Sequence, residues 1–332
     1  MMHSRRDFVQ TSLLSMSAAA SLSFARCVSA EESVDADTAN LPPLRYMKRG
    51  IKKTSLWEIG LRLETRRCNC ANVTATFPVP MNWPEQRVQV LDQTIDPAIT
   101  TIQKRYLNDT VEQVVLGMRQ APAGNVFEAI FEVEIDRWQL LPPDDTTIFR
   151  IPKKISRELR GYTIPSPYIA STDGRIKRIA TTLAAETYDT DWQHIAAIYD
   201  WVRENINYVE GKIKSAVQAL KDKTGDCEEM TSLFVALCRA SKIPARMVWV
   251  QGHCYPEFYM EDPEGQGVWF PCQAAGTRQF GRMEDYRLLL QKGDRFKIPG
   301  QRQPVRYVAE NFSCTRKGSA APAPIFIRQT KN

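Results

Sequence analysis

The sequence predicts an α+β protein in which an antiparallel β-sandwich is followed by a part that contains both helices and strands. Two changes of pattern carry this prediction. Between residues 51 and 141, apolar residues alternate with polar ones, which is the two-residue period of a half-buried strand. From residue 173 onward, apolar residues recur at helical spacing, and short apolar runs typical of strands follow after residue 246.

Length and composition indicate an ordinary globular protein. The chain has 332 residues, enough for two domains, and its hydrophobic content of 43% and charged content of 25% are usual values. The formal net charge is +6, and the basic residues are scattered rather than clustered. This net charge is too small to indicate a nucleic-acid partner.

Residues 1–30 are predicted to be an export signal. The segment Ser4–Val9 resembles the twin-arginine export motif, and an apolar run from Leu13 to Ala25 follows it. Small residues at Val28–Ala30 suit a cleavage point, and the apolar run is too short for a permanent membrane span. We therefore expect export to the periplasm or the extracellular space, with the twin-arginine export machinery as a partner. The alternative is an uncleaved N-terminal anchor.

The next two segments are predicted to be a linker and the β-sandwich. Residues 31–50 are polar, acidic and then proline-containing, which is typical of a linker. The sandwich is predicted over residues 51–145, where proline-rich breaks mark the turns between alternating strands. Cys68 and Cys70 lie at a strand end without visible metal partners, so we interpret them as structural.

The second structural part is predicted over residues 160–312. Its expected elements are helices at Asp173–Thr187, at Asp191–Asn207 and after Gly225, and strands at Met247–Gln251, His253–Met260, Val268–Gln273 and Val305–Phe312. The loop at residues 261–267 is rich in turn formers and predicts a hairpin. Gly, Ser, Ala and Pro alternate in residues 315–332, which we expect to be a mobile tail.

Gly225-Asp226-Cys227 predicts a tight turn followed at once by a helix. Glycine permits the turn, Asp226 is a good N-cap residue, and apolar residues then repeat along one helix face. Cys227 therefore falls in the first turn, where the helix dipole favours an anion. Such a position, with a nearby imidazolium, lowers a thiol pKa from about 8.5 to roughly 3.5–7.5. The alternative is a buried cysteine packed under the start of a helix.

A cysteine nucleophile needs a base, and the sequence offers few. It has three histidines: His3 lies in the signal, His194 is expected on a helix surface or partly packed, and His253 begins a strand after the Cys227 helix. Seven cysteines remain after residue 30, and this odd number leaves at least one thiol unpaired unless chains are joined. We therefore pair Cys227 with His253.

These residues resemble the bacterial transglutaminase-like superfamily. The resemblance covers about residues 160–312 and is carried by Ile198–Val202, Asn205–Tyr208, Gly225-Asp226-Cys227, Ile243–Arg246, His253 and Trp269–Pro271. It implies a papain-like core of helices packed on an antiparallel sheet, with Cys at a helix start, His on the following strands and Asp on the strand beside the His. The preceding sandwich resembles the N-terminal partner of some members.

Two positions depart from the family pattern. Cys254 follows His253 where the family often has Ala, and Gln273 stands where an Asp is expected. An amide can orient an imidazole by a hydrogen bond, as Asn does in papain-like enzymes, but it supplies no charge. Glu257 lies four residues from His253, roughly 13 Å along a strand, and cannot easily replace the missing carboxylate.

The resemblance implies a cysteine enzyme that acts on peptide amide bonds through Cys227, His253 and Gln273. A thioester intermediate would pass its acyl group to water, as in a protease or amidase, or to an amine, as in a cross-linking acyl transferase. The expected partner is a peptide or protein substrate, and no cofactor or metal is predicted. One alternative is a non-catalytic binding module that keeps the fold. A metal site formed by Cys227, His253, Cys254 and Cys272 is the other.

The resemblance also implies a strand register. If His253 stands opposite Gln273 in an antiparallel pair, then Cys254 stands opposite Cys272, on the side of the sheet away from the site. Directly opposed Cβ atoms lie about 4.5–5.5 Å apart, so a slightly strained disulfide is feasible. Two buried thiols are the alternative.

Overall fold

The computed structural model describes residue 38 and residues 41–331, and residues 41–331 lie in one compact unit. The predicted export signal at residues 1–30 lies outside the described residues. Among the described residues, no helix has both the length and the apolar content that crossing a membrane requires.

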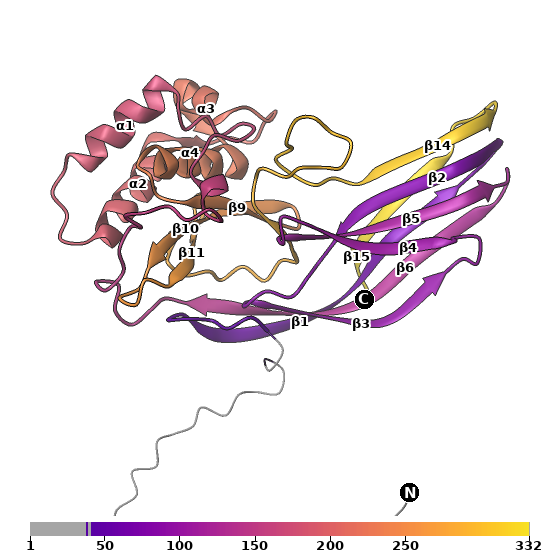
Figure 1. The fold of residues 1–332 in the computed structure, drawn as a ribbon, viewed down its shortest axis with the longest axis horizontal. Coiled ribbons are helices and arrows are strands. Elements are labelled where there is room, and N and C mark those ends of the chain that lie inside the picture. The colour runs from indigo at the N-terminus through magenta and orange to yellow at the C-terminus, as the bar shows by residue number, and fades with distance from the viewer. Residues whose placement is uncertain (1–37, 39–40, 332) are drawn as a thin grey trace, which may run out of the picture. The chain divides into compact units, whose positions relative to one another are not determined.

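The predicted antiparallel sandwich is confirmed, and it contains eight strands (Figure 1). These are β1 (Lys48–Glu64), β2 (Cys68–Val79), β3 (Gln86–Ile95), β4 (Thr101–Leu107), β5 (Val111–Ala121), β6 (Val126–Leu141), β14 (Asn311–Gly318) and β15 (Ala323–Thr330). One sheet has the order β15-β1-β6-β3 and the other β14-β2-β5-β4. All pairs within both sheets are antiparallel.

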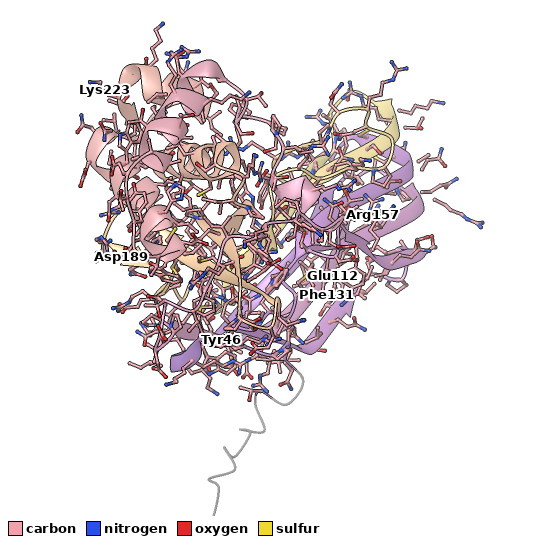
Figure 2. All side chains as sticks on the ribbon, turned by 60° about the vertical axis from the view of Figure 1, so that its left-hand side comes forward. Tyr46, Glu112, Phe131, Arg157, Asp189 and Lys223 are labelled. Atoms are coloured by element: carbon pink, nitrogen blue, oxygen red, sulfur yellow. The ribbon has the colours of Figure 1, made fainter. Side chains whose placement is uncertain are left out.

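Alternation along β1 explains how the sheets face each other. Ile59, Leu61 and Leu63 are at most 2% exposed and form part of the apolar layer between the sheets. Gly60 allows β6 to approach closely, because a Cβ there would lie 2.0 Å from the carbonyl oxygen of Ala129. Figure 2 shows Phe131 and Glu112 in this sandwich part, far from Asp189 and Lys223 in the helical part.

The expected mobile tail at residues 315–332 is wrong. β14 and β15 extend to Thr330, and each pairs with a sandwich strand, β14 with β2 and β15 with β1. Phe326 packs against Phe77 with ring centroids 6.0 Å apart. The residues from Ser319 to Pro322 form the connection between the two strands, and the apolar residues of β15 bind the end of the chain to the sandwich.

The expected linker at residues 31–50 is also wrong where the structure describes it. Met47 is 7% exposed and belongs to the apolar core of the helical part. Tyr46 packs edge-on against Phe149, and Arg45 forms an ion pair of 2.8 Å with Asp262. Apolar and aromatic side chains therefore fix this segment before β1 begins.

The helical part contains four α-helices, all near one antiparallel sheet (Figure 1). The elements are η2 (Arg160–Tyr162), α1 (Gly174–Ala184), α2 (Asp191–Asn205), β7 (Asn207–Tyr208), α3 (Ala216–Asp222), β8 (Thr224–Gly225), α4 (Cys227–Ala240), β9 (Ala245–Val250), β10 (His253–Glu261), β11 (Gly267–Gln273), β12 (Gln279–Phe280) and β13 (Leu289–Lys292). The five-stranded sheet has the order β12-β11-β10-β9-β13, and β7 pairs in parallel with β8. The predicted core of helices on an antiparallel sheet is confirmed.

The helix α4 lies at the centre of this core. Every residue from Glu229 to Arg239 is buried, and the helix packs against β9, β10 and the other three helices. The helices predicted at residues 173 and 191 are present, and both start after a capping side chain, Asp173 or Thr190. The helix α3 was not predicted.

The strand expected at Val305–Phe312 does not complete the sheet. That edge is formed by β13, which pairs with β9, whereas most of the expected segment precedes β14. Alternate residues of this region serve two cores: Leu289 lies in the core of the helical part, and Leu288 and Leu290 lie in the core of the sandwich. The buried Gln86 side chain accepts a hydrogen bond from the Leu289 N–H (2.8 Å) and donates one to its carbonyl (3.0 Å). The two parts of the fold therefore share this strand.

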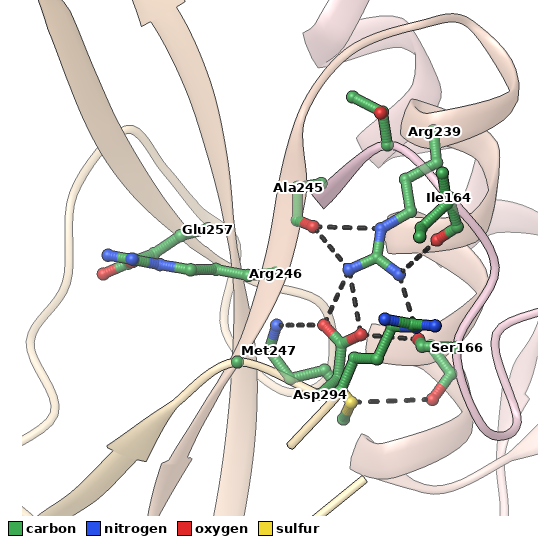
Figure 3. Close-up of polar contacts among 12 residues, drawn as sticks. Ile164, Ser166, Arg239, Ala245, Arg246, Met247, Glu257 and Asp294 are labelled. Atoms are coloured by element: carbon green, nitrogen blue, oxygen red, sulfur yellow. Dashed lines mark hydrogen bonds and ion pairs between the residues drawn. The ribbon is translucent and has the colours of Figure 1, made fainter. Parts of the chain in front are cut away.

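A buried ion pair fixes the C-terminal end of α4 (Figure 3). Arg239, in the last turn, forms a 2.8 Å ion pair with Asp294, and the two side chains are 0% and 1% exposed. The guanidinium also donates to the carbonyl oxygens of Ala245 and Ile164. A cation in this position additionally complements the helix dipole.

Candidate active site

The turn before α4 is built by a capping box. The Asp226 side chain accepts a hydrogen bond from the Glu228 N–H (2.7 Å), and the Glu229 side chain accepts one from the Asp226 N–H (2.9 Å). Gly225 is required by packing, because a Cβ there would lie 2.6 Å from the Cβ of Glu229. The predicted N-cap is thus confirmed, and Cys227 is the first residue of α4.

The other two predicted site residues lie together beside this helix start. His253 is the first residue of β10, after a tight turn in which Gly252 has a φ of 69°. Its Nε2 forms a hydrogen bond of 2.9 Å with Oε1 of Gln273, the last residue of β11. This contact leaves Nδ1 of the imidazole for the Cys227 sulfur, with which His253 also interacts. The structure therefore brings Cys227, His253 and Gln273 together.

Two residues of α2 hold the backbone of Gln273, and sequence reasoning did not identify their role. The Tyr199 hydroxyl donates to the carbonyl oxygen of Gln273 (2.8 Å), and Nη1 of Arg203 donates to the same oxygen (3.1 Å). Arg203 also donates to the carbonyl of Gly276 (2.7 Å). Tyr199 belongs to the helix segment that carried the family resemblance, but only the three-dimensional contact reveals what it orients.

Cys254 is a second thiol at the site. Its side chain is buried, and its Sγ lies 3.6 Å from the carbonyl oxygen of Cys227. It also interacts with the Cys227 sulfur and with Thr231, one turn further along α4. The expectation that Cys254 points away from the site is therefore wrong.

These neighbours make Cys227 a strong acid for a thiol. Hydrogen bonding from Cys254, together with the interaction with His253, outweighs the opposing effect of burial and lowers the pKa of Cys227 to about 5. For His253, burial acts to lower the pKa, but the interactions with Cys227 and Gln273 outweigh it and raise the pKa above its ordinary value of 6.5. A thiolate–imidazolium pair is therefore stable between these two pKa values.

The pH dependence of alkylation is expected to follow the pKa values of the thiols. The thiolate is the reactive form, so alkylation of Cys227 by iodoacetamide should rise as the pH increases through about 5 and should be fast at neutral pH. Burial raises the pKa of Cys70 to about 12, so that thiol should stay unmodified at neutral pH. Mass-spectrometric mapping of alkylated peptides at several pH values measures the alkylation of Cys227 and of Cys70. First modification of Cys68 or Cys314 at pH 6–7 would contradict this assignment.

The three residues line an open cleft of about 770 Å³. Its walls include Tyr208, which is 53% exposed, and the loop at residues 284–287. The N–H of Cys227, as a first-turn group, has no acceptor within the helix and can bind a developing oxyanion. The arrangement therefore offers a thiolate, a proton donor and an oxyanion site on an accessible surface.

The expected strand register is wrong by two residues. In the observed ladder Glu257 pairs with Pro271 and Met260 with Val268, and continuing this register places Gln273 opposite Tyr255. His253 is then a diagonal neighbour of Gln273, a spacing of about 7–8 Å that long side chains can bridge. Cys254 therefore does not stand opposite Cys272, and all seven described cysteines are free thiols.

Other predicted candidates lie away from this cleft. The His194 ring stacks on Tyr188, with ring centroids 5.2 Å apart, and its Nε2 is buried. Glu257 is 1% exposed and is bound by Arg246 and Lys292, at 2.6 Å from each. Cys68 and Cys70 are buried in the sandwich. Within residue 38 and residues 41–331, no group of three or more His, Cys, Asp or Glu side chains is arranged to hold a metal ion.

Comparison with known proteins identifies a solved structure of similar fold. A search of curated proteins by sequence found no match. Among solved structures, the "Putative Cysteine Protease" from Cytophaga hutchinsonii has 17% identity and a TM-score of 0.56, over 86% of this chain and 93% of that chain. The periplasmic domain of TgpA from Pseudomonas aeruginosa has 13% identity and a TM-score of 0.32, over 70% and 94%. The first similarity supports a shared fold across both the sandwich and the helical part.

The family comparison covers the segment that holds the cleft residues. Residues 177–274 match the model of the transglutaminase-like superfamily. This range contains α2, α4, β10 and β11, and with them Cys227, His253 and Gln273. Over residues 177–274, the chain is therefore similar to the transglutaminase-like superfamily.

Proposed function

We propose that the chain is an exported cysteine enzyme that attacks peptide amide bonds through Cys227. The observation that carries this proposal is a thiol at a helix start whose pKa is lowered to about 5, beside an imidazole fixed at 2.9 Å by Gln273. Export is inferred from the twin-arginine-like segment at Ser4–Val9.

The proposed reaction has two stages. The Cys227 thiolate attacks the amide carbonyl, the oxyanion is bound by the Cys227 N–H, and the His253 imidazolium gives its proton to the leaving amine. A thioester remains on Cys227. Neutral His253 then removes a proton from the incoming water or amine, which attacks the thioester and releases the acyl group.

The molecule that accepts the acyl group from the thioester distinguishes the two kinds of enzyme. Water as the acceptor makes a protease or amidase, and an amine makes an acyl transferase. The cleft is open rather than enclosed, so water reaches the thioester, and this favours hydrolysis. The competing proposal, a non-catalytic binding module, is favoured by Gln273, because an amide stabilises imidazolium less than a carboxylate does.

A peptide-based electrophile tests the proposed function. A peptidyl vinyl sulfone should label Cys227 in the wild-type chain and should label His253→Ala much more slowly at neutral pH, because the contribution of His253 to the lowered Cys227 pKa is lost. Peptide amides should then yield a thioester on Cys227, trapped by acid and detected by intact mass. Adding a primary alkylamine shows whether the acyl group passes to nitrogen. Equal labelling of the wild type and His253→Ala would favour the binding module.

Gln273 is expected to act as a positioning residue for His253. Gln273→Ala removes the 2.9 Å hydrogen bond, so kcat should fall by roughly 10-fold or more while the fold is kept. Gln273→Asp restores an acceptor with a charge, so it should keep at least part of the turnover and raise the pKa of His253 further. The pH profile of kcat measures both effects. Wild-type turnover in Gln273→Ala would remove Gln273 from the site.

A further inference from the structure

The thiol of Cys254 takes no covalent part in the reaction proposed above, although its Sγ lies 3.6 Å from the carbonyl oxygen of Cys227. We propose that Cys254 is the resolving thiol of Cys227, so that oxidation joins the two sulfurs in a disulfide and closes the site reversibly. This inference rests on the proposed nucleophilic role of Cys227 and adds a means of regulation to the same site.

The position of the two thiols carries the proposal. Cys227 lines the open cleft and is half-buried, so an oxidant in solution can reach it. Cys254 is 1% exposed and lies behind it, with Sγ 3.6 Å from the Cys227 carbonyl oxygen. Its side chain interacts with the Cys227 sulfur and with Thr231 on the same face of α4. One thiol is therefore accessible and its neighbour is shielded.

The other described cysteines do not offer this arrangement. Cys238 and Cys272 are buried in the core of the helical part, and Cys68, Cys70 and Cys314 lie in the sandwich. Cys254, in contrast, has its Sγ 3.6 Å from the Cys227 carbonyl oxygen and interacts with the Cys227 side chain. The ionised state of Cys227 further favours it as the thiol that is oxidised first.

The oxidant that the proposal requires is a hydroperoxide. The Cys227 thiolate attacks the peroxide, an S–O bond forms as the O–O bond breaks, and hydroxide leaves, which gives a sulfenic acid. The Cys254 sulfur then attacks the sulfenic sulfur. An S–S bond forms, the S–O bond breaks, and the Cys254 proton leaves with the hydroxyl group as water. A dithiol reductant reverses the change, becoming a disulfide itself while both thiols are restored.

The consequence is protection of the nucleophile. A sulfenic acid without a neighbouring thiol reacts again with peroxide and becomes a sulfinic acid, which ordinary thiols do not reduce. Formation of the disulfide stops the oxidation of the Cys227 sulfur at a product that thiols can reduce, and it leaves no free thiolate at the site. A site of this kind would be inactive in strongly oxidising surroundings and would recover its activity under reduction.

Hydrogen peroxide and peptide mapping test the proposal on the full chain. Each protein is treated with a several-fold molar excess of hydrogen peroxide, because a sulfinic acid needs a second equivalent; free thiols are then blocked, and the digest is analysed without reduction. We expect a peptide pair joined through Cys227 and Cys254, two hydrogens lighter than its components and lost with dithiothreitol. In Cys254→Ala, Cys227 should instead become a sulfinic acid that dithiothreitol does not reverse. Cys254→Ser provides a second variant that keeps a polar side chain.

A matched control and a prior labelling step separate the two proposals. Cys314→Ala changes a thiol in the sandwich and should form the Cys227–Cys254 disulfide as the wild type does. Sulfinic acid at Cys227 in the wild type, at the rate seen in Cys254→Ala, would overturn the inference. If iodoacetamide modifies Cys227 first but no disulfide forms, the inference alone fails. If Cys227 is not modified first, the proposed function fails with it.

Discussion

Cys227→Ala is expected to lower kcat/KM for peptide amide substrates by about 10⁴-fold or more, since without the sulfur no thioester can form. His253→Ala should cause a loss of similar order, because it removes the proton donor for the leaving amine and the imidazolium that helps keep the Cys227 pKa near 5. The two residues act as one unit. The double variant should therefore be no slower than Cys227→Ala alone.

Turnover of a peptide amide and acid-trapped intact mass measure this prediction together. Cys314→Ala is the matched control, because it removes an equivalent side chain from the sandwich and should turn over like the wild type. All variants should unfold at similar temperatures. Turnover that survives in Cys227→Ala would mean that a different group carries the reaction.

The elements that hold the candidate site could be predicted from the sequence because they are defined by local rules. The start of α4 follows from a glycine that packing requires, an aspartate that caps the helix and a glutamate that completes the capping box. His253 and Gln273 follow from the alternating strands of one hairpin. The contact between Cys254 and Cys227 was missed because a strand pattern alone assigned Cys254 to the opposite face, whereas its Sγ lies 3.6 Å from the Cys227 carbonyl oxygen at the helix start.

The register error also has a physical cause. A hairpin register is set by its turn, and the predicted strand ends, Met260 and Val268, are partners in the observed ladder. These ends alone therefore determine the correct register. Placing His253 directly opposite Gln273 ignored the possibility that long side chains meet along the diagonal, which is how the 2.9 Å contact forms.

Elements that depend on distant partners could not be predicted in this way. β13 is only four residues long, and its edge position depends on the buried Gln86, which is 203 positions away in sequence. β14 and β15 flank the turn-rich stretch that suggested a mobile tail, and their pairing with β2 and β1 is a tertiary contact. Composition describes the connection between these strands correctly but not the strands themselves.

The largest stability effect is expected at the opposite end of α4. Asp294→Asn should lower the free energy of unfolding by about 3–5 kcal/mol, because it leaves the fully buried Arg239 guanidinium without its counter-charge. Both carboxylate oxygens accept from Nη2 of Arg239, at 2.9 and 2.8 Å, and one also accepts from the Met247 N–H. An amide replaces one of these acceptors with a second donor. The unfolding temperature should fall by on the order of 10 °C.

An exposed ion pair of the same length serves as a control that shows how much of the stability effect is due to burial. Arg278 and Asp200 are also 2.8 Å apart, but their side chains are 55% and 36% exposed. Asp200→Asn should therefore cost at most about 1 kcal/mol, because solvent already screens that pair. The double variant Arg239→Met/Asp294→Leu removes both buried charges and should recover much of the stability lost in Asp294→Asn. Equal losses of unfolding free energy in Asp294→Asn and Asp200→Asn, measured by chemical unfolding, would show that the buried pair does not fix the end of α4.

If the pair does fix that end, its loss should also slow alkylation of Cys227, since the same helix presents the thiol at its other end.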